Sequence, residues 1–439
     1  MLIRFRVQNF RSILEEQEVS FVAYNQREKA GSLIDTEHPV GLLLRAISIY
    51  GANASGKSNF LNAFGFFRNA VSRSQSRWRE IGIPMSQFAS LPNPELTSRF
   101  VLDFIAEDVR YEYGFSSTAT EFTEEWLFAY PKGRKQVWFE RTNNSQFAFG
   151  KRLQTPENRR KAEGIAPLVR PNSLFLSAAI QNNFELLKPV FNEIATQWTV
   201  VPGSRHQTAM RTAENSMTDE VMRTRIGKLL QAADLGLVGY EVDEELMSEA
   251  QQKMVLALIN AMPESEQPKD EDFDYKVPRV LFVHENEAGA NFKFNMSNES
   301  DGTVAYFGLL GPVIETLKVG GLLIVDEIET SLHPKLAAAI VEMFNNPEIN
   351  STNAQLIFST HASTLLTEGE LRRDQIWIAE KDRRGATKIF PLTDFHLRKG
   401  ERVDRGYLQG RFGGIPFIDR DLIRAFVSPT ANDKASEPV

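Results

Sequence analysis

Short apolar or alternating stretches near the N-terminus predict three β-strands, at residues 2–7, 19–24 and 42–50. The third stretch is apolar, rich in β-branched residues and ends at a glycine, as expected for a buried strand. A stripe of apolar residues then follows at helical spacing and predicts a helix at residues 59–74; its members are Phe60, Phe64, Phe67 and Val71. The pattern therefore predicts a strand, a glycine turn and a helix in succession.

The rest of the chain divides into three regions. Aromatic-rich stretches within residues 98–150 predict an antiparallel sheet. Residues 155–265 are mostly helical in pattern, most clearly at 182–198 and 218–233. Strands and helices alternate from residue 276 onward, with strands at 276–300, 321–325 and 355–359 and helices at 303–317 and 334–345. This alternation predicts a parallel sheet covered by helices.

These regions predict an α/β fold in which one lobe is interrupted by an insertion. Residues 1–150 form the N-terminal half of the lobe, residues 151–275 a mainly helical lid, and residues 276–427 the C-terminal half. The acidic, proline-containing stretch 263–274 is expected to be a surface loop or a disordered linker, and residues 428–439 a flexible tail.

Composition excludes several classes of protein. The chain has 439 residues, 42% hydrophobic and 24% charged, and no apolar run near the length of a transmembrane helix, so we expect no membrane partner. Residues 1–7 alternate apolar and basic residues like a first strand and lack the apolar core of a signal peptide, so we expect a cytoplasmic protein. The absence of cysteine excludes disulfides, thiolate catalysis and cysteine zinc sites. A net charge of −7 argues against a generally basic nucleic-acid surface. Two basic stretches, 68–79 and 151–161, fit solvated helix faces better than a DNA patch, which remains the alternative.

Residues 51–58, with the sequence GANASGKS, fit the P-loop pattern between a predicted strand and a predicted helix. In such a loop the glycines let backbone N–H groups turn toward phosphate oxygens, and the helix N-terminus adds favourable charge. The Lys57 ammonium is expected to reach the β- and γ-phosphates, and the Ser58 hydroxyl to bind Mg²⁺. The predicted ATP-binding residues are Gly51, Asn53, Ala54, Ser55, Gly56, Lys57, Ser58 and Asn59.

The apolar strand at 321–325 leads directly to Asp326 and Glu327, at the strand end where parallel sheets bind ligands. We expect Asp326 to bind Mg²⁺ through water and Glu327 to orient or deprotonate the attacking water. His361 ends the next predicted strand, in Ser-Thr-His, and is positioned to hydrogen-bond the γ-phosphate. Glu327, His361 and Lys57 are therefore the predicted catalytic residues.

These motifs resemble those of the ABC ATPases of the RecF/SMC/OLD group. The likeness is strongest to stand-alone ATPases of bacterial anti-phage and abortive-infection operons, such as RloA and the ATPase subunit of PARIS. Besides the P-loop, the stretches that carry it are residues 9–12, 170–177, 299–303, 325–334, 359–363 and 407–416. The resemblance implies an ABC-type ATPase lobe, a nucleotide-sandwiched homodimer or higher homo-oligomer, a separately encoded nuclease effector and a phage protein as trigger.

The resemblance also assigns residues outside the P-loop. Ser300, Gly302 and Thr303 match a degenerate signature motif that faces the γ-phosphate held by the other subunit; by itself this turn would be a helix N-cap. Residues 331–334 match the D-loop that crosses to the partner. Gln87 is at the place of the Q-loop glutamine, which contacts nucleotide and Mg²⁺, and Arg11 resembles a nucleotide-contacting residue.

The chain departs from its larger relatives, because no sustained heptads occur between the two halves of the site. Two Asp-x-Asp triplets, Asp272/Asp274 and Asp419/Asp421, lack the glutamate partner that two-metal nuclease chemistry needs. The resemblance therefore implies the sensor and scaffold subunit of an anti-phage system, with the lid and residues 407–416 expected to contact effector and trigger. A RecF-like repair ATPase that binds DNA directly is the alternative, and a transporter ATPase fits least.

Overall fold

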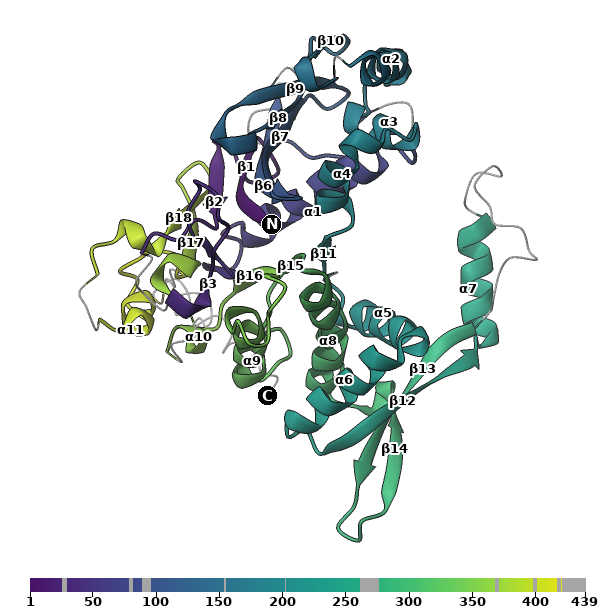
Figure 1. Cartoon of the computed structure of the whole chain (residues 1–439). Helices are drawn as coiled ribbons and strands as arrows, with labels where there is room; N and C mark the ends of the chain where they lie inside the picture. Colours follow the sequence, from purple (N-terminus) through teal and green to yellow (C-terminus); the bar gives the residue numbers. More distant parts are fainter. Residues whose placement is uncertain are drawn as a thin grey trace, which may run out of the picture.

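The computed structural model describes residues 1–25, 30–78, 82–88, 96–153, 155–201, 203–260, 276–367, 371–397, 401–416 and 420 (Figure 1). It confirms the α/β fold, with two large sheets, a three-stranded sheet and covering helices. The acidic stretch 263–274, both Asp-x-Asp triplets, Arg79 and the tail 428–439 lie outside the described residues. No helix in the described ranges is both long and apolar enough to cross a membrane.

The first large sheet has seven antiparallel strands in the order β10-β9-β8-β7-β6-β1-β2. Its strands are β1 (Leu2–Gln8), β2 (Gln17–Ser20), β6 (Ser98–Ala106), β7 (Val109–Ser117), β8 (Phe122–Ala129), β9 (Gln136–Thr142) and β10 (Gln146–Phe149). The antiparallel sheet expected in 98–150 is confirmed. The strand expected at 19–24 is wrong in extent, because β2 begins at Gln17 and ends at Ser20, and Val22 forms only an isolated bridge to Leu43.

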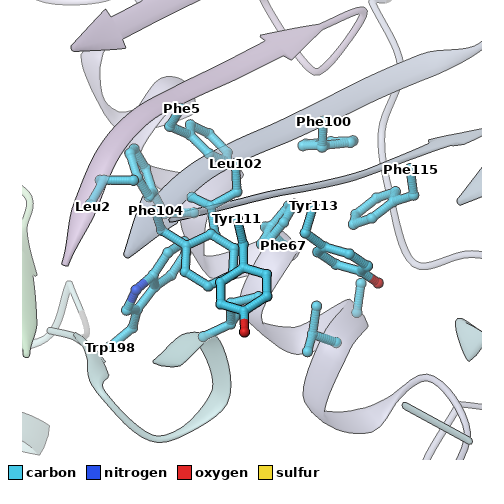
Figure 2. Close-up of a cluster of buried hydrophobic side chains, with 14 of the residues drawn as sticks. Leu2, Phe5, Phe67, Phe100, Leu102, Phe104, Tyr111, Tyr113, Phe115 and Trp198 are labelled. Carbon is cyan, nitrogen blue, oxygen red and sulfur yellow. The ribbon is translucent and has the colours of Figure 1, made fainter. Parts of the chain in front are cut away.

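Helix α1 (Lys57–Arg73) packs its aromatic stripe against this sheet. Phe64 stacks on Phe5 of β1 at 4.0 Å between ring centroids, and Phe67 stacks on Phe115 of β7 at 5.1 Å. Trp198 closes the cluster beside Phe67 (Figure 2). The four apolar residues predicted on one helix face are all buried, so burial of this stripe is what fixes α1 to the sheet.

The second large sheet follows the order β11-β15-β16-β5-β17-β18. Its strands are β5 (Ala46–Tyr50), β11 (Trp198–Val200), β15 (Leu322–Val325), β16 (Gln355–Thr360), β17 (Ile376–Lys381) and β18 (Thr387–Pro391). All are parallel except β18, which runs antiparallel to β17. The predicted parallel sheet is thus confirmed, and the C-terminal ends of β5, β15 and β16 meet at one edge.

A separate layer forms around α8 (Asp301–Val319) (Figure 1). Helices α5 (Arg205–Thr218) and α6 (Glu220–Ala232) pack beside it, next to the three-stranded sheet of β12 (Leu237–Leu246), β13 (Lys276–Glu285) and β14 (Asn291–Asn295). Helix α7 (Glu249–Asn260) follows β12 and projects from the body of the molecule (Figure 1).

The remaining elements are short: β3 (Leu33–Ile34), β4 (Leu43–Leu44), α2 (Pro156–Ile165), α3 (Phe175–Gln181), α4 (Lys188–Ala195), α9 (Pro334–Asn345), α10 (Thr364–Thr367) and α11 (Val403–Leu408). The single helix expected at 182–198 is wrong, because Asn183 has a positive φ of 56° and Trp198 already pairs with Leu322 in the central sheet. The expected lid also contributes strands, β11 to the central sheet and β12 beside β13. The domain boundaries themselves stay a prediction.

Candidate nucleotide site

The P-loop joins β5 to α1 at the edge where the parallel strands end. Ala54 and Gly56 both have positive φ angles, 62° and 102°. A Cβ atom at Gly51 would lie 2.3 Å from the Ala379 carbonyl oxygen, and one at Gly56 would lie 1.9 Å from the Thr387 hydroxyl. Both glycines are therefore required by close packing on the β17–β18 hairpin, and Gly56 also by its backbone angle.

The Lys57 ammonium lies inside this loop. Nζ donates hydrogen bonds to the carbonyl oxygens of Gly51, at 2.8 Å, and Ala52, at 3.1 Å, and lies 3.0 Å from His361 Nε2. Burial lowers the pKa of Lys57, and the nearby carboxylates of Glu327, Asp326 and Glu329 oppose that shift. The cation is thus held by weakly solvated loop carbonyls, which an anionic ligand can outcompete.

Two carboxylates follow β15. Ser359, in β16, donates its hydroxyl to Asp326 Oδ1 at 2.5 Å and accepts a hydrogen bond from the Glu327 N–H at 2.8 Å. Glu327 has a φ of 49°, and its Oε1 lies 3.7 Å from His361 Nε2. The adjacent strands therefore bring Lys57, His361 and Glu327 together, as the motif order predicted.

Other predicted residues surround this centre. Ser58 is half-buried in the first turn of α1, while Asn53 and Ala54 are exposed at the tip of the loop. Ser55 is buried, and its hydroxyl has no hydrogen-bond partner among the described residues. This unpaired hydroxyl, the phosphate cradle and the carboxylate pair fit a nucleotide with a divalent cation.

Sequence reasoning missed a hydrogen-bond network that joins the P-loop and α1 to Ser12 and to β18. Thr387 of β18 lies 2.8 Å from the Ser12 hydroxyl and donates to the Ser55 carbonyl at 3.0 Å. The Thr387 N–H also donates to the Ser12 carbonyl at 2.7 Å, and Asn59 Nδ2 donates to the Ser12 hydroxyl at 2.8 Å. Ser12 belongs to a stretch that carried the family resemblance, whereas a lone threonine in a strand gives no signal.

Arg11 and Gln87 lie near each other on the flank of the site. The Arg11 N–H donates to the Ser86 carbonyl at 2.8 Å, and the exposed guanidinium lies 5.5 Å from the centroid of the Phe10 ring. Gln87 Nε2 donates to the Leu96 carbonyl at 2.6 Å. Among the described residues no hydrogen bond or ion pair joins either side chain to the P-loop, so their nucleotide contacts stay predictions.

The residues of the predicted signature motif cap α8. The Ser300 hydroxyl accepts a hydrogen bond from the Thr303 N–H at 3.1 Å and lies 2.9 Å from its hydroxyl. A Cβ atom at Gly302 would lie 2.9 Å from the Ser331 carbonyl, so the start of α8 touches the turn that follows Glu327. Within the described part of the chain, no hydrogen bond joins Ser300 to the P-loop.

Residues 407–416 were expected to form a contact surface for effector and trigger. Tyr407 and Phe412 are buried behind the P-loop strand and so are not part of such a surface, whereas Leu408 is exposed; the effector and trigger contacts stay a prediction. The Tyr407 hydroxyl donates to the Gly414 carbonyl at 3.2 Å, and its ring packs edge-on against Tyr50 of β5 at 5.5 Å. Burial raises the pKa of Tyr407, and the backbone N–H of Gly51 partly opposes this shift.

Comparison with known proteins gives one family. The AAA domain family described as a putative AbiEii toxin of a Type IV TA system matches residues 47–367. No curated protein matches the chain. Similar solved structures include an SMC head bound to the C-winged helix domain of ScpA, at 14% identity and a TM-score of 0.43 over 89% of this chain and 96% of that one. Another is the SMC head domain from Thermotoga maritima, at 13% identity and a TM-score of 0.39 over 89% of this chain and 98% of that one.

The family match spans the P-loop, both carboxylates and His361, and covers well over half of the chain, so the protein belongs to this family of AAA domains.

Proposed function

We propose that the protein binds ATP with Mg²⁺ and hydrolyses it as a nucleotide-sandwiched homodimer or higher homo-oligomer. The observation that carries the proposal is the Lys57 ammonium, held inside a P-loop 3.0 Å from His361, with Asp326 and Glu327 at the end of a neighbouring strand. This is a cation, a hydrogen-bonding imidazole and two carboxylates at one sheet edge, the groups that phosphoryl transfer needs for positioning and charge neutralisation.

We propose a role for each of these residues. Lys57 exchanges its loop carbonyls for the β- and γ-phosphate oxygens, and backbone N–H groups of the loop cradle the phosphates. Glu327, more exposed than Asp326, orients the attacking water and accepts its proton, while His361 donates to the γ-phosphate. Ser58 and Asp326 are the residues that would hold Mg²⁺, which when bound neutralises the developing phosphate charge.

The dimer is part of the proposal because Ser300 caps α8, Gly302 lies in its first turn, and no hydrogen bond among the described residues joins Ser300 to the P-loop of the same chain. A serine hydroxyl, a glycine N–H and a helix N-terminus together form a second anion site. This site would contact the γ-phosphate bound by the partner subunit, and each subunit would supply half of two identical sites.

The biological role that we propose is the sensor and scaffold subunit of a bacterial anti-phage system, close to RloA and the ATPase subunit of PARIS. A phage protein would be the trigger and a separately encoded nuclease the effector. The family description names a putative AbiEii toxin of a Type IV TA system, and we take this as support for a protein that acts together with a separately encoded partner.

A RecF-like role in DNA repair is the second candidate. A surface cavity of about 610 Å³ between α6 and α8 has a mainly apolar lining that includes the cations Arg225, Lys228 and Lys318. Lys318 forms an ion pair with Asp219 at 3.3 Å. Cations grouped in this way can contact DNA phosphates. DNA binding by the purified protein that weakens with salt, and is lost in Lys228→Glu, would favour this candidate over the scaffold role.

The ATPase proposal is tested with Glu327→Gln. The amide cannot accept the proton of the attacking water, so ATP binding should persist while turnover stops and the ATP-bound dimer accumulates. Phosphate release, calorimetry and light scattering measure the three quantities. Glu342→Gln, an exposed change in α9, is the matched control and should behave as the unmodified protein. Normal turnover in Glu327→Gln would place the catalytic carboxylate elsewhere.

A further inference from the structure

Arg205, the first residue of α5, contacts the backbone of the two residues that follow β15. Its Nη2 donates to the Asp326 carbonyl at 3.3 Å and also to the Glu327 carbonyl. Burial lowers the pKa of Arg205, and the carboxylates of Glu327, Glu329 and Asp326 oppose the shift. The Arg205 Nε atom is buried without a partner in the described structure, so the guanidinium has been desolvated in order to make these carbonyl contacts.

The residue that Arg205 contacts has an unfavourable backbone conformation. Glu327 has a φ of 49°, in the left-handed region that side chains with a Cβ avoid. Its N–H is held by the Ser359 hydroxyl at 2.8 Å, and its carbonyl accepts from Arg205 and from the Thr330 N–H at 2.9 Å. Such a conformation persists only where its surroundings enforce it, and Arg205 supplies one of the enforcing contacts.

Helix α5, which carries Arg205, packs tightly on α8, the helix that Ser300 caps and that we call the signature helix. The Thr212 hydroxyl of α5 donates to the Gly308 carbonyl of α8 at 2.7 Å. A Cβ atom at Gly308 would lie 3.0 Å from the Ala209 nitrogen, and one at Gly311 would lie 2.3 Å from the Thr212 hydroxyl. Because glycines bring the two backbones into contact, α5 cannot keep its place if α8 shifts.

We propose that Arg205 is a positioning residue that holds Glu327 in its left-handed conformation and makes that conformation depend on the position of the signature helix. The chain of contacts runs from Ser300 through α8 and α5 to the Glu327 carbonyl. Engagement of Ser300 by nucleotide on the partner subunit would then reach the catalytic carboxylate through α5. This inference rests on the proposed ATPase function.

The kinetic test compares Arg205→Ala, Arg205→Lys and Arg211→Ala. Arg211 is an exposed arginine on the same helix and is the matched control for loss of charge. Arg205→Ala should lower kcat at least about tenfold with little change in KM, because misplacement of a catalytic group by about 1 Å can cost about 100-fold in rate. Arg205→Lys should recover part of the rate, since an ammonium can donate to the carbonyls but lacks the planar fork. Arg211→Ala should match the unmodified protein.

A second measurement does not depend on turnover. In hydrogen exchange without nucleotide, Arg205→Ala should speed exchange in residues 326–332 and leave α1 unchanged. The inference is overturned if kcat of Arg205→Ala stays within about twofold of the unmodified value, if KM rises while kcat holds, or if α1 exchanges as much faster as residues 326–332. Absence of ATP hydrolysis by the unmodified protein would refute the proposed function, whereas the exchange result would still decide whether Arg205 holds Glu327.

Discussion

Gly56→Ala is the substitution that tests most directly whether the P-loop must keep its observed geometry. Gly56 has a φ of 102°, and a Cβ atom there would lie 1.9 Å from the Thr387 hydroxyl, 2.8 Å from Thr387 Cγ2 and 2.9 Å from the Ser12 hydroxyl. Thr387 is buried and bonded to both Ser12 and the Ser55 carbonyl, so it cannot rotate away without losing those partners. The loop itself must therefore move.

The size of the effect follows from two contributions. A residue with a Cβ atom held at a disfavoured backbone angle costs about 1–3 kcal/mol. Relief of the overlap requires a shift of about 1 Å, since ordinary Cβ contacts are longer than 3.0 Å. If the free loop relaxes and ATP binding must restore the observed conformation, the strain alone weakens ATP binding by about 5- to 150-fold.

The assay is ATP affinity by calorimetry for Gly56→Ala, with Gly227→Ala as the matched control. Gly227 lies inside α6 with open space around it, so alanine there should leave ATP affinity unchanged and stabilise the helix slightly. Thr387→Ala removes two of the three atoms that Gly56→Ala would meet. The loss of ATP-binding free energy in the double variant should therefore be smaller than the sum of the losses in the two single variants.

Two outcomes would refute this reasoning. Unmodified ATP affinity in Gly56→Ala would show that the loop tolerates a side chain at this angle. Strict additivity in the double variant would show that Thr387 is not the obstacle.

Four further predictions concern the site. Lys57→Ala should abolish or greatly weaken ATP binding by calorimetry, because the cation facing the phosphates is lost; unchanged affinity would contradict the P-loop assignment. Burial lowers the pKa of Lys57 below its usual 10.5, and bound phosphates favour its charged form. ATP binding should therefore weaken as pH rises above this lowered pKa, where binding takes up a proton; binding heats in buffers of different ionisation enthalpy should show this uptake, and heats independent of the buffer would contradict it. Ser300→Arg should bind ATP but not hydrolyse it, and mixing it with Lys57→Ala should restore some phosphate release through one intact composite site; a mixture no more active than either parent would weaken the trans arrangement. The purified protein alone, incubated with Mg²⁺ or Mn²⁺ and ATP, should not cut plasmid DNA or tRNA on gels; cleavage that survives repurification and disappears in Asp419→Ala or Asp272→Ala would make the protein a nuclease itself.

The arrangement of Lys57, Glu327 and His361 could be predicted because parallel strands end at one edge. Glu327 and His361 come within two residues of the end of an apolar strand, and Lys57 follows β5 through the loop at residues 51–56. Motif order and strand direction therefore bring them together. The helix at residues 59–74 could also be predicted, since its aromatic stripe has the helical period.

What could not be predicted depends on contacts between distant parts of the chain. Thr387 supports Ser55 across 332 positions of sequence, through a hairpin that only the folded sheet places beside the loop. Arg205 resembles any arginine in the first turn of a helix until α5 is packed on α8. The stretch 182–198 has a helical apolar pattern, yet Trp198 begins strand β11 because it pairs with Leu322 in the central sheet.

The order of strands in the two large sheets has a consequence for synthesis of the protein. Every strand of the seven-stranded sheet comes from residues 2–149, so that sheet can close while the ribosome is still translating the remainder. Strand β5, which carries the P-loop, lies between β16 and β17 and waits for residues 355–381. Its supporting Thr387 is made later still. A chain whose translation stops early therefore holds a folded N-terminal sheet without a finished nucleotide site, and the ATPase centre is among the last parts of the molecule to be completed.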